Sequence, residues 1–446
     1  MEEKRNNQVN INTNPNPKVL LITYYWPPAG GPGVQRWFHF VRHLPLFGIT
    51  PVVYVPKNPQ YPIVDETLTE DLPKEVVIIK RSISEPYKWI SWLFKKKTQQ
   101  LSQGLIQENK PSLIERFMRF VRGNFFIPDA RVSWVAPSVA FLSQYINEHG
   151  IETIISTGPP HSMHLIANEL VKIHTRLKWI ADFRDPWTTI GYHNDLYMTH
   201  WAQKKHLKLE KTVLQSAHTI LTTSYTTKAL FSKKTATPIE VITNGFEPFE
   251  NSSLTSPEEN KFSLVHIGSL LSKRNPKILW EAIGELVTEN QLFAAQLSID
   301  FVGLVSDEVK ATITAHGLAS YCNFHGYISH EEARKHQYTA HLLLLIEIDS
   351  EAHKGIIPGK IFEYLQSLRP ILAIGPKDWD VARLLPENNL NALGTYHDKA
   401  MVKSFIETRF NAGTGISAEI DPTLSKYERK NLTEALSKII KNLKRS

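Results

Sequence analysis

Residues 18–55, KVLLITYYWPPAGGPGVQRWFHFVRHLPLFGITPVVYV, decide the fold class of this chain. The run 18–24 is short and apolar, which is typical of a strand buried on both faces. A glycine-rich loop follows at 26–33, and residues 34–46 then carry apolar side chains at helical spacing. A second apolar run at 50–55 completes a strand, loop, helix, strand unit. This unit predicts a doubly wound α/β domain.

The same alternation breaks down between about 60 and 130, resumes and continues to residue 223, and starts again at residue 262. Between the two runs, residues 251–260 (NSSLTSPEEN) have the composition of a linker. We therefore expect two Rossmann-like α/β domains that face a cleft, where open sheets of this kind bind ligands. The expected divisions are a disordered tail at 1–17, a first domain at 18–250 with an insertion at about 60–130, a second domain at 260–424, and a helix at 425–446 that crosses back to the first domain.

Composition excludes several classes of protein. The 446 residues include 51 Lys or Arg and 44 Asp or Glu, so the formal net charge is +7. The single cysteine, Cys322, excludes an internal disulfide and a thiolate metal cluster. The N-terminus lacks the apolar run of a secretory signal, and no apolar stretch reaches the ~20 residues of a membrane span. We therefore expect a cytoplasmic protein that does not bind nucleic acid.

The segment 89–97, WISWLFKKK, differs from its surroundings. Trp89 and Trp92 stand beside Lys95, Lys96 and Lys97, a composition typical of a helix that lies on an anionic membrane. An inserted helix with its aromatic side chains packed on the domain and its lysines in water has the same pattern. Both interpretations stay open, and the first would place the chain at the cytoplasmic membrane face.

The motif PGKIFEYL at 358–365 follows an apolar strand and opens a helix. Pro358 suits a first helical turn, and Gly359 allows a ligand to approach the backbone. Lys360 and Glu363 are three residues apart and share one face of the helix start. The lysine can meet a phosphate and the carboxylate can accept hydrogen bonds from ribose hydroxyls. An ion pair between the two side chains is the alternative.

A second loop, 268–276 (GSLLSKRNP), also joins a strand to a helix. Lys273 or Arg274, together with the lysine at 360, could neutralise a diphosphate. Asp378 and Asp380 form a D-x-D pattern of the kind that holds a divalent cation, but so short a pattern often arises by chance. We expect no metal ion and no cofactor.

The glycine loop of the first domain departs from the dinucleotide fingerprint. Gly30 and Gly31 can offer backbone N–H groups to an anion, or can simply allow a tight turn. In a G-x-G-x-x-G motif that begins at Gly31 the last glycine would fall on Arg36, which disfavours an NAD enzyme. Residues 355–360 are one residue short of a Walker loop and lack its Ser or Thr, which disfavours an ATPase.

Polar residues follow two further strands of the first domain. The segment 156–164 contains His161, and the segment 182–187 contains Arg184 and Asp185. Because both follow strands of one sheet, their side chains should face the same cleft. A capping histidine that is satisfied within the fold is the alternative for His161.

Taken together, these motifs resemble the retaining glycosyltransferases of family 4, which have the GT-B fold, and in particular bacterial members that assemble surface polysaccharides. The resemblance rests on YYWPPAGGPGVQRW (24–37), PDARVSW (128–134), STGPPHS (156–162), DFRDPW (182–187), TNGFE (243–247), HIGSL (266–270), HGYISHEEA (325–333) and PGKIFEYLQS (358–367). It therefore covers nearly the whole chain.

The resemblance implies a nucleotide-diphosphate sugar as donor substrate on the second domain, and a glycan or polyprenyl-linked acceptor on the first. It implies catalytic roles for His161, Lys360 and Glu363, donor contacts from Gly30, Gly31, Gly268, Lys273, Arg274, Gly326, Tyr327, Ile328, Pro358 and Gly359, and acceptor-side positions for Arg36, Arg184 and Asp185. One departure is Gly355, which stands where the family often has a glutamate, eight residues before Glu363. The acidic contact to the donor sugar is then absent or replaced by backbone.

The implied reaction is metal-independent transfer of a hexose-type sugar with retention of anomeric configuration. Its main requirement is stabilisation of charge on the departing diphosphate, which cations and helix N-termini can supply. Two alternatives stay open. One is a sugar-nucleotide epimerase or hydrolase of the same fold, and the other is a non-catalytic partner that binds nucleotide sugar in polysaccharide assembly.

Overall fold

The computed structural model describes residues 16–61, 64–65, 72–84, 112–189, 191–248, 257–386, 390–413 and 422–443. Residues 89–97, with the aromatic and lysine side chains noted above, lie outside this part of the chain, as does most of the expected tail. Within the described residues, no helix combines the length and the apolar character needed to cross a bilayer.

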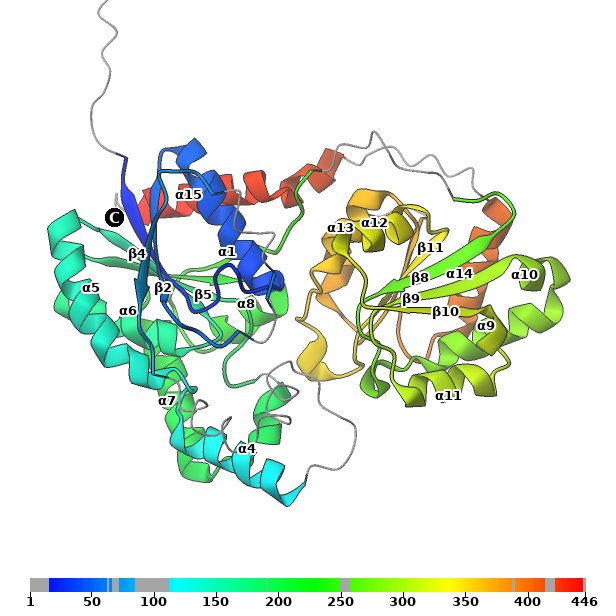
Figure 1. Cartoon of the computed structure of the whole chain (residues 1–446), viewed down its shortest axis with the longest axis horizontal. Coiled ribbons are helices and arrows are strands. Elements are labelled where there is room, and N and C mark those ends of the chain that lie inside the picture. Colours follow the sequence, from blue (N-terminus) through cyan, green and yellow to red (C-terminus); the bar gives the residue numbers. More distant parts are fainter. Residues whose placement is uncertain are drawn as a thin grey trace, which may run out of the picture.

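The first domain is built on a seven-stranded parallel sheet in the order β3-β2-β1-β4-β5-β6-β7 (Figure 1). Its strands are β1 (Lys18–Ile22), β2 (Thr50–Pro56), β3 (Val77–Arg81), β4 (Thr153–Gly158), β5 (Lys178–Phe183), β6 (Thr219–Thr222) and β7 (Ile239–Val241). Its helices are α1 (Pro32–His43), α4 (Leu113–Phe125), α5 (Val135–His149), α6 (Ser162–Ile173), α7 (His200–Ser216) and α8 (Tyr225–Ser232).

Both faces of this sheet are buried, as the apolar character of β1 requires. Leu20 and Ile22 belong to a core shared with α5 and α6, whereas Val19 and Leu21 belong to a core on the opposite face. Alternate side chains of a strand point to opposite faces, so a strand covered on both sides must be apolar throughout.

The second domain repeats the strand order of the first without a visible repeat in sequence. Its six parallel strands run β10-β9-β8-β11-β12-β13, which corresponds strand for strand to the first six of the first domain. They are β8 (Phe262–Ile267), β9 (Leu297–Val302), β10 (Cys322–Gly326), β11 (Leu342–Ile346), β12 (Ile371–Ile374) and β13 (Asn391–Gly394). The helices are α9 (Lys277–Glu289), α10 (Gln291–Gln296), α11 (Asp307–Ala315), α12 (His330–Tyr338), α13 (Lys360–Ser367) and α14 (Lys399–Ala412). The prediction of two doubly wound α/β domains is confirmed.

The region 60–130, expected as an insertion, contributes a strand to the sheet. β3 pairs in parallel with β2 at the edge, with Val52 opposite Val77. Only one face of an edge strand is well covered, and Val77 is itself exposed. The segment therefore lacks the continuous apolar run that marks the central strands.

The chain passes between the domains twice at one place. The outgoing segment pairs with the returning one through an isolated bridge between Phe246 and Glu428. Gly245 is required there because a Cβ would overlap the Tyr427 carbonyl. The returning chain then forms α15 (Arg429–Leu443), whose Leu432, Leu436 and Ile440 pack into the core of the first domain beside α1.

Candidate functional site

Lys360 and Glu363 lie at the start of α13, at the carboxyl edge of the second sheet. Gly359 is the N-cap, so the helix begins at Lys360. The Lys360 ammonium donates a 2.5 Å hydrogen bond to the carbonyl of Ile267, the last residue of β8. Burial and the nearby Arg274 charge lower the pKa of Lys360 to about 8. Within the described residues this ammonium makes no ion pair.

The structure separates the two basic candidates of the loop after β8. Lys273 is exposed, whereas Arg274 forms a fork with Glu347 at the end of β11. The Arg274 Nε to Glu347 Oε1 distance is 3.0 Å and the Nη2 to Oε2 distance is 3.2 Å. Glu347 is almost fully buried, and this role was not predicted because nothing in its local sequence marks it. Arg274 is thus held in one place beside Lys360.

Glu363 meets the neighbouring helix α12. Its Oε1 lies 3.3 Å from His330 Nε2, and its backbone carbonyl accepts a 2.7 Å hydrogen bond from Gln337. The His330 and Glu363 side chains are both partly open to water. The carboxylate is therefore accessible, and an incoming hydroxyl could replace the imidazole as its hydrogen-bond partner.

The segment after β10 presents an exposed ring beside the loop after β8. Gly326 has a φ of +64°, a conformation that favours glycine. The Tyr327 side chain is 73% exposed, and its hydroxyl lies 3.4 Å from that of Ser269. Ile328 is half-buried. Gly268, with a φ of +113°, leaves the room that Lys360 needs, because a Cβ there would lie 2.7 Å from its Nζ.

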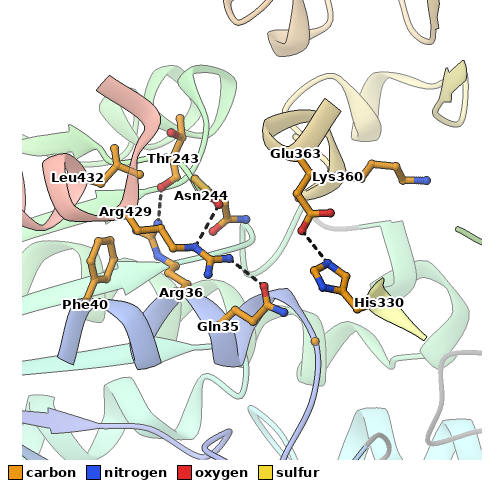
Figure 2. Close-up of a pocket in the computed structure, with 13 residues that line it drawn as sticks. Gln35, Arg36, Phe40, Thr243, Asn244, His330, Lys360, Glu363, Arg429 and Leu432 are labelled. Carbon is orange, nitrogen blue, oxygen red and sulfur yellow. Dashed lines mark hydrogen bonds and ion pairs between the residues drawn. The ribbon is translucent and has the colours of Figure 1, made fainter. Parts of the chain in front are cut away.

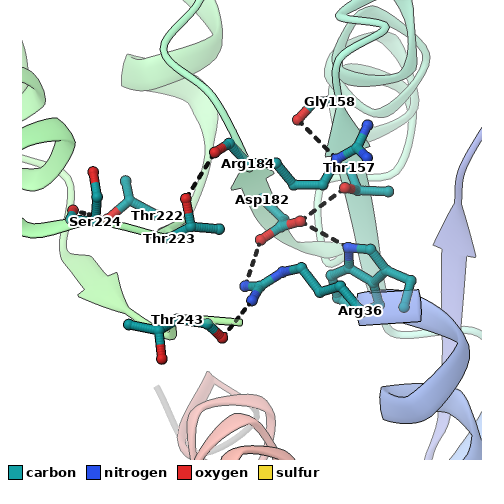
Figure 3. A network of polar contacts seen from close by, with 10 residues as sticks. Arg36, Thr157, Gly158, Asp182, Arg184, Thr222, Thr223, Ser224 and Thr243 are labelled. Atoms are coloured by element: carbon teal, nitrogen blue, oxygen red, sulfur yellow. Dashed lines mark hydrogen bonds and ion pairs between the residues drawn. The ribbon is translucent and has the colours of Figure 1, made fainter. Parts of the chain in front are cut away.

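In the first domain a buried carboxylate organises the corresponding edge (Figure 3). Asp182, at the end of β5, is fully buried. It accepts hydrogen bonds from Arg36 at 3.0 Å, from the Trp37 indole at 2.7 Å and from the Thr157 hydroxyl at 2.7 Å. Arg36 also donates to the Thr243 carbonyl at 2.8 Å. Arg36 is therefore engaged by the protein itself, although part of it lines the cleft described below.

Arg184 and Asp185 follow β5 and lie beside the glycine loop. Arg184 donates to the carbonyls of Gly158 and Pro159. A Cβ at Gly33 would overlap its guanidinium, which explains a glycine at that point of the loop. Burial raises the pKa of Asp185, although the Arg184 charge acts in the opposite direction. A carboxyl group of raised pKa at a strand end is a candidate for proton transfer.

His161 occupies a more enclosed position than the other predicted residues. It is 3% exposed, and its ring stacks on Trp187 with centroids 4.5 Å apart and planes 3° from parallel. Burial, followed by neighbouring histidines and Arg184, lowers its pKa well below the usual value. Neither ring nitrogen has a hydrogen-bond partner among the described residues. His161 is also absent from the described lining of the cleft between the domains.

That cleft brings the two domains and the last helix together (Figure 2). Its lining includes Gly31, Gln35, Arg36, Phe40, Thr243, Asn244, Gly245, His330, Gly359, Lys360, Glu363, Arg429 and Leu432. Gly30 is the chain neighbour of the first of these, and Pro358 precedes Gly359 as a half-buried residue.

Arg429 is the residue of this cleft that sequence reasoning missed. Its Nη2 donates to Gln35 Oε1 at 2.9 Å and its Nε donates to the Gly245 carbonyl at 3.2 Å. Burial lowers its pKa, while the charges of Glu247 and Glu363 raise it. Figure 2 shows the guanidinium on the first-domain side, across from Glu363 and His330. It lies 66 residues from Glu363 along the chain, so only the return of α15 places it here.

No protein-family model and no curated protein matches the chain. Solved structures do match it. A glycosyltransferase from Rickettsia africae ESF-5 aligns with a TM-score of 0.59 at 15% identity, covering 96% of this chain and 98% of that chain. The apo form of the lipopolysaccharide outer core galactosyltransferase WaaB aligns with a TM-score of 0.59 at 13% identity, covering 95% and 99%. An E. coli structure described as trehalose-6-phosphate bound with UDP-2-fluoro glucose aligns with a TM-score of 0.59 at 11% identity, covering 96% and 99%. The chain has the GT-B fold.

Two positions singled out in the sequence, Asp380 of the D-x-D pattern and Gly355, lie where the two GT-B domains meet. Asp380 of the D-x-D pattern accepts hydrogen bonds from the Thr226 backbone at 2.8 Å and from its hydroxyl at 2.9 Å, at the start of α8. Gly355 approaches the same helix start, where a Cβ would lie 3.0 Å from Ser224 Oγ and 3.1 Å from Thr226 Cβ. A side chain at 355 would therefore require the start of α8 to shift slightly, so glycine suits this close approach.

Two clusters in the described part of the GT-B chain have donor atoms close enough to share a metal ion. They are His39, His43 and Glu247, and Asp300, His325 and His336. In the first cluster Glu247 Oε1 lies 2.9 Å from His39 Nδ1 and 3.1 Å from His43 Nε2. Burial raises the pKa of Glu247, but hydrogen bonds with both histidines outweigh it and lower the pKa. These contacts join α1 to the segment between the domains.

Proposed function

We propose that this protein is a retaining glycosyltransferase that moves a sugar from a nucleotide-diphosphate donor to a glycan or lipid-linked acceptor. The observation that carries the proposal is the start of α13. There, an ammonium without an ion-pair partner among the described residues and an accessible carboxylate share the edge of a Rossmann-like sheet. Both residues line a cleft that residues of the first domain also line. Two of the matched structures are named as a glycosyltransferase and a galactosyltransferase, and a third is described as bound with UDP-2-fluoro glucose.

On the donor side, each group suits one part of a nucleotide-diphosphate sugar. Lys360 and Arg274 would neutralise the diphosphate, with the fork to Glu347 holding the guanidinium in position. Glu363 would accept from the ribose hydroxyls after releasing His330. The exposed ring of Tyr327 and the adjoining backbone would meet the base. Lys273, which is exposed, would contribute less than Arg274.

On the acceptor side, Asp185 and Arg184 are the candidates. Asp185 sits where burial raises its pKa, so it can accept a proton from an acceptor hydroxyl more readily than an ordinary aspartate. Arg184 is held by two backbone carbonyls and orients that region. Arg36 would act indirectly, by keeping Asp182 and the glycine loop in place. His161 would support the part of the site that holds the transferred sugar, because its ring is packed against Trp187 and is fixed in position.

The chemistry asked of the protein is modest in this scheme. The bond between the sugar and the diphosphate breaks while the acceptor hydroxyl attacks from the same face, and the hydroxyl proton leaves with the diphosphate or a nearby base. Lys360, Arg274 and the N-terminus of α13 stabilise the charge that develops on the leaving group. The proposed reaction uses no metal ion. The backbone at Gly359, which lines the cleft, would contact the donor sugar in place of an acidic side chain.

A thermal-shift screen of UDP-, GDP-, ADP- and CMP-sugars tests the first step. One sugar nucleotide should raise the melting temperature, because a ligand that binds only the folded state stabilises it. Incubation of that donor with and without candidate acceptors tests the second step. Acceptor-dependent product supports the proposal, whereas rapid complete turnover without acceptor would identify an epimerase or hydrolase. Binding with no turnover in either condition would identify a non-catalytic nucleotide-sugar-binding protein.

A further inference from the structure

The helix α4 is oriented opposite to the usual amphipathic helix. Leu113, Ile114, Phe117 and Phe125 are all well exposed, with Phe117 64% and Phe125 72% exposed. At 100° per residue these four side chains span one arc of roughly 120°. An amphipathic helix on a globular protein normally turns such an arc toward the core.

The part of α4 that is buried against the protein is its last turn, which has small residues. Gly123 and Asn124 are its buried positions. A Cβ at Gly123 would lie 2.7 Å from the Leu196 carbonyl, so the helix approaches that segment closely. The Asn124 amide donates to the Tyr197 carbonyl at 3.2 Å, and its oxygen accepts from the Thr199 backbone at 2.7 Å. The helix is therefore attached through small residues of its last turn, and the large apolar side chains along its length are left exposed.

The next helix extends this surface with a tryptophan and a row of cations. Thr199 is the N-cap of α7, so the Asn124 contact brings the end of α4 to the start of α7. Trp201, two residues further on, is 62% exposed, and the Lys205 ammonium lies 5.0 Å from the centre of its ring. Figure 1 shows α4 and α7 together at one end of the first domain, away from α15.

The charges on this surface select its partner. The two helices carry Arg116, Arg119, Arg122, Lys204, Lys205, Lys208 and Lys211 against Glu115 and Glu210. Glu210 is buried and paired with Lys234, and Glu115 closes the capping box of α4, so neither offsets the exposed cations freely. Large apolar side chains, an interfacial tryptophan and flanking cations are the composition that binds an anionic lipid surface. A second copy of the chain would bring the same positive charges together.

We infer that α4 and the start of α7 form a docking surface for an anionic membrane. The apolar arc of α4 enters the headgroup region, the Trp201 ring sits at the interface, and the arginine and lysine side chains reach lipid phosphates. The inference deepens the proposed function, because a lipid-linked acceptor is reached at a membrane. It does not depend on catalysis, since vesicle binding needs neither donor nor acceptor.

Vesicle flotation of the full chain tests the inference, using phosphatidylcholine vesicles with and without phosphatidylglycerol. The wild type should float with the anionic vesicles, and high salt should weaken but not abolish binding. Phe117→Ser/Phe125→Ser should reduce the bound fraction at least tenfold at equal lipid. The matched control is Leu292→Ser on α10, an exposed leucine in the other domain, which should bind as the wild type does.

Charge variants test the second half of the surface. Arg119→Glu/Arg122→Glu should reduce binding to anionic vesicles, whereas Lys430→Glu/Lys441→Glu on α15 makes the same change in charge far from α4 and should not. Equal loss in both pairs would show that only net charge matters and would overturn the assignment to α4. Unchanged flotation of the phenylalanine variant would also overturn it, as would a wild-type dimer in sedimentation that the same variant converts to monomer. Donor binding, measured without vesicles, reports separately on the proposed function.

Discussion

The two sheets have the same strand order, but the charged groups at their carboxyl edges are held very differently. In the first domain the Arg36 side chain is 1% exposed and pairs with Asp182, which also accepts hydrogen bonds from Trp37 and Thr157. In the second domain the corresponding edge leaves the Lys360 ammonium with only a carbonyl oxygen as partner among the described residues. One edge, the closed edge, uses its cation in a buried ion pair, and the other, the open edge, leaves its cation without one among the described residues. Similar topology therefore does not imply similar use.

The largest expected effect follows from the closed edge. Asp182→Ala would leave Arg36 buried without its counter-charge, and breaking a buried pair in this way costs about 3–5 kcal/mol. Glu347→Ala should cost clearly less, because the Arg274 side chain is 32% exposed and can be hydrated. Denaturant unfolding of both variants measures the difference. Thr157→Val removes one hydrogen bond to Asp182 and should lower the free energy of unfolding by about 1 kcal/mol. If Asp182→Ala does not fold, this milder variant can be compared with Glu347→Ala in its place.

The next effect concerns the open edge and catalysis. Lys360→Ala should lower the rate of sugar transfer by at least ~10²-fold, the scale expected for losing one preorganised electrostatic contact. Its melting temperature without donor should stay close to that of the wild type. Steady-state transfer assays compare it with Lys277→Ala, an exposed lysine at the start of α9 that should keep its activity. Wild-type activity in Lys360→Ala would remove the ammonium from the proposed site.

Glu363→Ala probes the same edge through the donor. It should also lower transfer at least ~10²-fold if the carboxylate holds the ribose in the transition state. A 2′-deoxyribose donor should then be a poor substrate for the wild type and should lose little further in the variant. If the variant discriminates between ribose and deoxyribose donors as strongly as the wild type does, Glu363 does not contact the ribose.

Acid should weaken both domains, because each contains buried neutral histidine. Burial lowers the pKa of His164 to about 3 and that of His341 to about 4. A group whose pKa is lowered by folding stabilises the protein above its unfolded value, near 6.5, and this contribution is lost as pH falls. At pH 5 each histidine should lower the free energy of unfolding by about 2 kcal/mol relative to pH 7.5. Urea unfolding at pH 7.5 and pH 5 measures the loss, which His341→Gln should reduce and His200→Gln, an exposed position, should not.

The smallest effect separates the charge of Lys360 from its shape. With a pKa near 8 in the free protein, Lys360 loses its proton as pH rises, so kcat/KM should fall about fivefold between pH 8 and pH 9. Bound diphosphate favours the ammonium, so the decline in kcat should come at higher pH. Lys360→Arg keeps its charge in this range and should lose the alkaline limb, whatever its absolute rate. An unchanged limb in this variant would assign it to another group.

Sequence reasoning recovered the fold where a segment carried its own signal. The central strands are continuous apolar runs because they are buried on both faces. The start of α13 is indicated by Pro358 and Gly359, which precede its first residue. The edge strands β3 and β7 were missed because an edge strand needs less apolar surface. The sequence did not predict that the two sheets share a strand order, since the same topology can be built from unrelated side chains.

For the candidate site, the local motif was enough to name Lys360 and Glu363 but not their partners. Arg274 could not be chosen over Lys273, because only the distant Glu347 distinguishes them. Arg429 could not be found, since it reaches the cleft only when α15 returns to the first domain. Gly355 and Asp380 resembled ligand contacts, yet they meet the start of α8.

The sequence by itself determined two α/β domains and the loops at which a ligand would bind, because periodicity and turn residues act over a few positions. Only the tertiary structure decided which charges are used internally and which face the cleft. It also decided that α4 turns its apolar side outward, because the helix pattern is the same in either orientation. Burial and pairing depend on residues far apart in the chain, and their effect on a charge depends on distances that only folding sets.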